Sequence, residues 1–86
     1  MATSILQEWS KTTDGAHLRF ARIQLITSGT TVTYTPASRI LGNVSFINET
    51  TNATTVVGGT VTVSTNAWVS PTMAVNDICL VAFITD

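Results

Sequence analysis

The chain has 86 residues, of which 44% are hydrophobic and only 10% are charged, whereas an average soluble domain carries about 25% charged residues. Hydroxyl side chains replace the missing charge, with 17 Thr and 7 Ser. Four cations and five acids give a net charge of -1, which argues against binding nucleic acid through its phosphates.

The first segment, residues 1–15, is expected to be an N-terminal arm or a short helical turn. Ile5, Leu6 and Trp9 fall at helical spacing and lie outside every alternating run. Burying an apolar side chain of this size contributes roughly 1.5–3 kcal/mol, so the three need a partner surface. Either they plug the open end of the core, or the arm docks on a neighbouring protein. Residues 16–86 are expected to form a single β domain.

Residues 16–27 predict a long first strand in which the apolar positions change parity near Ala21. The change indicates a bulge near Ala21, or a strand that is apolar on both faces; a helix is the competing interpretation. Residues 30–35 alternate as a second strand. Pro36 ends that strand, because proline has no N–H to donate to a ladder.

The middle of the chain carries the strongest local signal. Residues 37–43 are expected to form a connection, followed by a strand over residues 44–48. Two β-branched runs within residues 54–65 then flank Gly58-Gly59, which predicts a hairpin with a two-residue turn, because glycines accept the positive φ angles of such turns. Residues 67–69 predict a further short strand.

The last strand is predicted over residues 78–85, after a turn at Asn76-Asp77. It is apolar on both faces and therefore belongs in the middle of a structure, closing a sandwich or covered by a second subunit. Together these strands predict an all-β protein, a small antiparallel β-sandwich or barrel of six to seven strands with an N-terminal arm. Thr suits the outward face of such strands, being polar yet β-branched.

No arrangement of residues predicts catalysis or metal binding, so we expect no enzymatic activity, no cofactor and no metal. His17 is the only histidine, and Asp14 is the only carboxylate near it in sequence. A single cysteine, Cys79, cannot form an internal disulfide or a Cys-rich zinc site. Because Cys79 lies in the most apolar strand, it is predicted to be an inert buried thiol.

Association with other proteins is the expected activity. A domain of this size buries only a modest share of its surface, and such chains gain stability from disulfides, metals or oligomerisation, so we expect a homo-oligomer. The candidate interface residues are Ile5, Leu6, Trp9 and Trp68. All four cations lie within the first 39 residues; this bias reflects either pairing between subunits or chance.

Several stretches resemble small all-β virion proteins of tailed bacteriophages: Val32-Thr33-Tyr34, Val44-Ser45-Phe46, and residues 59–65 and 75–84. In size the chain is most similar to head decoration (cement) proteins. The resemblance implies a module, a dimer or trimer, that coats the capsid and contacts the major capsid protein or another virion protein. It implies localisation in the virion after synthesis in the host cytoplasm. Nucleic acid is not expected as a partner because of the charge balance, and a membrane is not expected because the longest apolar run, residues 78–84, is too short to span a bilayer. The alternative is a receptor- or carbohydrate-binding module of a phage tail or fibre.

Overall fold

The computed structural model describes residues 3–13, 15–26, 29–51, 53–55 and 58–86, and these residues form strands and turns without a helix. The strands are β1 (Thr3–Thr13), β2 (Ala16–Leu25), β3 (Thr33–Tyr34), β4 (Ile40–Asn48), β5 (Ala53–Thr55), β6 (Thr60–Thr62), β7 (Ala67–Val69) and β8 (Ile78–Thr85). No helix of this part of the chain is long and apolar enough to cross a membrane.

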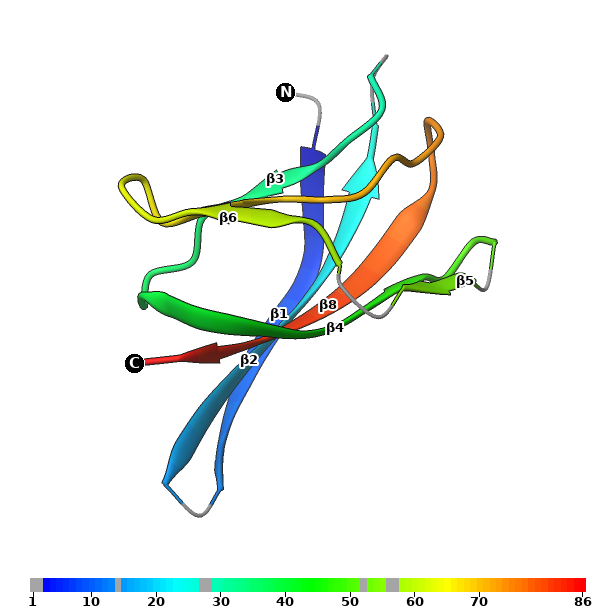
Figure 1. Cartoon of the computed structure of the whole chain (residues 1–86). Helices are drawn as coiled ribbons and strands as arrows, with labels where there is room; N and C mark the ends of the chain where they lie inside the picture. The colour runs from blue at the N-terminus through cyan, green and yellow to red at the C-terminus, as the bar shows by residue number, and fades with distance from the viewer. Residues whose placement is uncertain (1–2, 14, 27–28, 52, 56–57) are drawn as a thin grey trace.

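The strands form two antiparallel sheets (Figure 1). The large sheet has the order β1-β2-β8-β4-β5, and the small sheet has the order β3-β7-β6. The expected all-β antiparallel sandwich is therefore confirmed. The sequence predicted six or seven strands, and the described residues form eight, because the N-terminal segment is itself a strand.

The central position of β8 explains why it is apolar on both faces. It lies between β2 and β4 and pairs with both. Its inward side chains, Cys79, Val81 and Phe83, have no exposed surface. The prediction that this strand lies in the middle of the structure is confirmed.

The parity change in β2 comes from two apolar faces and not from a bulge. The register of β2 with β8 runs without a shift from His17 to Gln24. Ala21, Ile23 and Leu25 are fully buried between the sheets, so the alternate positions of β2 point outward. The strand is therefore apolar on both sides, and the helical interpretation of this segment is wrong.

Within the N-terminal segment, Thr3–Thr13 form a strand and not a helical turn; residues 1–2 and 14 lie outside the described residues. β1 pairs with β2 from Thr3 to Thr13, and its register shifts between Ile5 and Gln7, which makes a bulge. The bulge interrupts the alternation that identifies a strand in a sequence. Figure 1 shows that the far end of the β1–β2 hairpin extends past the small sheet.

The predicted hairpin at Gly58-Gly59 is also wrong. β5 pairs with β4 in the large sheet, whereas β6 pairs with β7 in the small sheet. The two glycines lie where the chain passes from one sheet to the other. A Cβ atom on Gly58 would overlap the Phe46 side chain, and one on Gly59 would overlap the indole of Trp68. Glycine is required here for close packing against these two aromatic residues.

β4 is longer than predicted and begins at Ile40, within the segment expected to be a connection. The sequence did not indicate a strand there, because register shifts after Ile40 and after Asn43 interrupt the alternation of side chains. The turn expected at Asn76-Asp77 is present: Asn76 has a φ of 75°, and the Asp77 N–H donates to the Ala74 carbonyl at 3.0 Å.

Two glycine substitutions test the packing at the sheet crossing. Gly59 and Gly15 have positive φ angles of 91° and 85°, so alanine at either position has a backbone cost of about 1–2 kcal/mol. Only Gly59 also lacks space for a Cβ atom, since Gly15 has nothing within 4 Å. We expect Gly59→Ala to lower the free energy of unfolding in urea by at least about 2 kcal/mol more than Gly15→Ala. Equal losses would contradict the packing role.

Candidate functional site

The most prominent surface feature is the outer face of the large sheet, the face turned away from the small sheet. The register aligns its side chains in rows across β1, β2, β8 and β4. The rows are Lys11-Leu18-Ile84-Gly42, Trp9-Phe20-Ala82-Ser45 and Gln7-Arg22-Leu80-Ile47. Most of these side chains are apolar, and nothing in the described part of the chain packs over them as a second layer.

Stacked aromatic rings mark the β1 side of this face. The Trp9 and Phe20 rings lie nearly parallel, with their centroids 5.2 Å apart. Trp9 stays 38% exposed, and Ile5 and Leu6 on the same strand are each 46% exposed. Three of the four residues predicted as interface candidates are therefore accessible, although only Trp9 lies on the outer face.

The fourth candidate, Trp68, is not accessible and is corrected to a core residue. It is fully buried and packs against Phe46 and against the edge of the Phe83 ring. Its indole N–H donates to the Gly58 carbonyl. Its place after a turn suggested a rim position, but β7 lies in the middle of the small sheet and directs the side chain inward.

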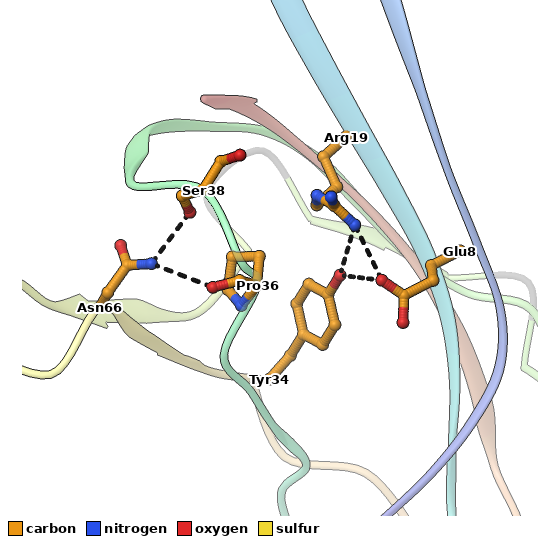
Figure 2. Close-up of polar contacts among 6 residues, drawn as sticks. All are labelled: Glu8, Arg19, Tyr34, Pro36, Ser38 and Asn66. Atoms are coloured by element: carbon orange, nitrogen blue, oxygen red, sulfur yellow. Dashed lines mark hydrogen bonds and ion pairs between the residues drawn. The ribbon is translucent and has the colours of Figure 1, made fainter. Parts of the chain in front are cut away.

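A polar clasp of Glu8, Arg19 and Tyr34 joins the two sheets on their inner side (Figure 2). Arg19 Nη1 donates to Glu8 Oε1 at 2.8 Å, and the Tyr34 hydroxyl donates to the same oxygen at 3.0 Å. Partial burial, more than the neighbouring charges, raises the pKa of Tyr34. The clasp attaches the edge strand β1 to the small sheet, and no motif in the sequence indicated it.

A second polar anchor, also drawn in Figure 2, fixes the turn into β7. The Asn66 side-chain amide donates to the Ser38 carbonyl at 2.9 Å and to the Pro36 carbonyl at 3.4 Å. Its Oδ1 accepts the Ile40 N–H at 2.8 Å. Asn66 has a φ of 53°, a conformation that asparagine tolerates better than most residues. One side chain thus ties the start of β4 to the small sheet.

Ion pairs within the chain join two cations of its first half to acids of its second half. Arg22 binds both carboxylate oxygens of Glu49, at 2.8 and 3.2 Å, and its Nη1 donates to Gln7. Arg39 pairs with Asp86 at 3.0 Å. Both pairs join a cation of the first half to an acid of the second. Because intramolecular pairing accounts for the bias, the bias gives no support to pairing between subunits.

A pocket of about 360 Å³ opens at the end of the sandwich where β4 and β8 meet the loop before β8; it is lined by Phe46, Asn48, Thr51, Pro71, Thr72, Met73, Ala74 and Asp77. Asp77 Oδ2 accepts hydrogen bonds from Asn48 Nδ2 at 2.9 Å and from the Ala74 N–H at 3.0 Å. Asn48 Oδ1 in turn accepts from the N–H groups of Thr50 and Thr51. The network holds the pocket wall in place.

The groups that could do chemistry lie apart. Among the described residues, no three His, Cys, Asp or Glu side chains form a possible metal site. The His17 ring lies 3.0 Å from the Thr12 hydroxyl on the exposed hairpin. Cys79 is buried, as predicted, and burial raises the pKa of its thiol to about 12, which favours the protonated, less reactive form.

Comparison with known proteins gives no relative: no family model, curated protein or solved structure matches the chain. The outer face is therefore the candidate site on physical grounds alone. The sequence indicated this face in part, because residues 16–27 and 78–85 are apolar on both sides. It did not indicate how the strands align their side chains into rows.

The Asp77 network is expected to make stability depend on pH. The hydrogen bond from Asn48, followed by that from the Ala74 N–H, holds the pKa of Asp77 below its ordinary value. A lowered folded-state pKa contributes stability that is present above the unfolded pKa, near pH 4, and is lost as the pH falls through the folded pKa. Asp77→Asn should therefore be less stable than the natural chain at pH 6, and the difference should narrow towards pH 2. Urea unfolding across this range measures it; a constant difference would contradict the assignment.

Proposed function

We propose that the chain is a non-enzymatic structural protein of a phage particle, which decorates and stabilises the capsid as a small homo-oligomer. The observation that carries the proposal is the mostly apolar outer face of the large sheet, on which Trp9 and Ile84 are each 38% exposed and Leu18, Phe20 and Leu80 are half-buried. Accessible apolar side chains gathered on one face are typical of a surface that binds another protein. The resemblance to small virion proteins in the Thr- and Val-rich strands adds the phage context.

The small sheet makes the argument stronger, because it shows how this chain treats a face that meets water. On that face Thr33, Thr60 and Thr62 are exposed, and Ala67 and Val69 of the middle strand lie between them, half-buried. The outer face of the large sheet has aromatic and aliphatic residues at most of its positions, with four polar or charged residues among them. Two outward faces of one small domain thus differ in chemistry, and the apolar one is suited to contact with protein.

Virions that lack the protein provide the test. Purified protein added to such particles should bind in a number set by the icosahedral lattice, and cryo-electron microscopy should show density over the capsid shell. Few ion pairs are available for binding and exposed ones contribute only about 0–1 kcal/mol each, so we expect binding to persist in about 1 M salt, where the Debye length is about 3 Å. Density confined to one tail vertex, or release by salt alone, would contradict capsid decoration.

The pocket beside Asp77 favours one second candidate, the receptor- or carbohydrate-binding module. It combines amide, carboxylate and hydroxyl groups with the apolar side chains of Phe46 and Met73, and small-molecule sites have this mixture of an apolar wall and a few fixed polar groups. Its volume of about 360 Å³ is suited to one sugar unit.

Thr72→Trp separates the two candidates. Thr72 lines the pocket and is exposed, so the large side chain should fill the pocket and leave the Asp77 network intact. If the chain is a glycan-binding module, glycan-array binding by the natural protein should be lost in this variant. If it is a decoration protein, neither form should bind glycans, and both should bind particles equally.

A further inference from the structure

We propose that the outer face of the large sheet binds a second copy of this chain, face to face, about a two-fold axis parallel to the strands. The axis runs between β2 and β8. It places the aromatic pair Trp9-Phe20 of each copy over the small residues Ala82 and Ser45 of the other. This inference rests on the homo-oligomer in the proposed function and names the surface that forms it.

The shape of the central row carries the argument. From β1 to β4 the row reads Trp9, Phe20, Ala82 and Ser45, so two large side chains are followed by two small ones. We call the stacked rings of Trp9 and Phe20 the ridge, and the two small side chains that follow in the row, Ala82 and Ser45, the trough. Rotation by 180° about an axis along the strands exchanges β1 with β4 and β2 with β8. Ridge then meets trough at both ends, which is the self-complementarity that a two-fold interface requires.

The charges of the face permit this pairing. Arg22 is neutralised on its own copy by both oxygens of Glu49. Lys11 lies on β1, the outermost of the four strands, and in the proposed dimer it faces Gly42. The two Lys11 side chains are then three strand spacings apart, about 14 Å, which exceeds the Debye length of about 8 Å at physiological salt.

The area is sufficient for a reversible dimer. Eight residues of β2 pair with β8, and four strands of this length at about 4.8 Å spacing and 3.3 Å rise cover about 500 Å². Two copies would bury about 1,000 Å² in total, which is the lower limit for a specific interface. We therefore expect a monomer–dimer equilibrium in the micromolar range and not a permanent dimer.

Association through the edge strand β1 is the competing arrangement, and the structure opposes it. The bulge between Ile5 and Gln7 breaks the regular edge. Glu8 is a charged residue on the inner face of that edge, held by Arg19 and Tyr34. Bulges and inward-pointing charges are the devices by which natural proteins block edge-to-edge pairing. The structure therefore opposes pairing of two copies through β1.

A size exchange between facing positions tests the geometry. Trp9 of one copy faces Ser45 of the other, so Ser45→Trp should oppose two indoles, and Trp9→Ser should leave a gap. Each single variant should raise the dimer dissociation constant by at least about tenfold, which is 1.4 kcal/mol. The double variant exchanges the sizes, and should return the constant to within about threefold of the natural value, a coupling characteristic of residues in contact.

Sedimentation equilibrium from low to high micromolar concentration measures these constants, and circular dichroism checks that each variant is folded. Val63→Ser is the matched control, because Val63 is 87% exposed and lies on the turn between β6 and β7, away from the face; it should leave dimerisation unchanged. Ser45→Arg replaces Ser45→Trp if the latter does not fold, since it places charge in the trough at an exposed position.

The possible results distinguish a second copy on the outer face from pairing through the β1 edge and from direct contact with the capsid. A dimer that is insensitive to Ser45 variants, but is lost when Gln7→Pro disrupts the β1 edge, would overturn the proposal in favour of edge pairing. A natural chain that stays monomeric, yet loses particle binding on Ser45→Arg, would show that the face meets the capsid directly; the decoration role would stand, and the homo-oligomer and its dimer would be wrong. A dimer that behaves as expected but binds no particle would leave the dimer standing and overturn the decoration role.

Discussion

The packing of one indole ring holds the two sheets together. Trp68 is enclosed by Phe46 and Phe83 from the large sheet, and its N–H satisfies the Gly58 carbonyl. An indole buried without a partner for its N–H would be costly, so the chain must pass close to the ring at that point. This requirement explains Gly58 and Gly59, and it places the crossing between β5 and β6.

The two faces of the large sheet have different roles: the inner face forms the core of the monomer, and the outer face contributes little to it. The inner apolar side chains of β2 and β8 are buried against the small sheet and supply the core of the monomer. The outer side chains of the same strands contribute little to that core, yet most of them are also apolar. Exposed Thr side chains make the outward face of the small sheet more polar, whereas most side chains in the outward rows of the large sheet are apolar.

The fold class could be predicted from sequence because it rests on periodicity, which survives in β7, β8 and most of β2. Predictions failed where a local signal had two physical causes. A pair of glycines such as Gly58-Gly59 can indicate a hairpin turn with positive φ angles, or a place without space for a Cβ atom. Here both glycines lack space for a Cβ atom. Gly59 also has a positive φ, but the pair does not form a hairpin turn. The bulges in β1 and β4 removed the alternation that would have placed those strands. The position of Trp68 depended on which sheet β7 joined, and that is a long-range fact.

The difference between local sequence signals and long-range strand pairing also explains which parts of the candidate site could be predicted. Trp9 could be named because a large apolar residue outside any alternating run needs a partner. The partner surface could not be named, because the rows of the outer face depend on the register of four strands that are distant in sequence. Once the register is known, the central row becomes specific: its two large side chains, Trp9 and Phe20, lie on adjacent strands, and its two small ones, Ala82 and Ser45, lie on the next two. Contact with solvent alone gives no reason to separate the side chains of a row by size, whereas a row that must fit a copy of itself about an axis along the strands requires that separation.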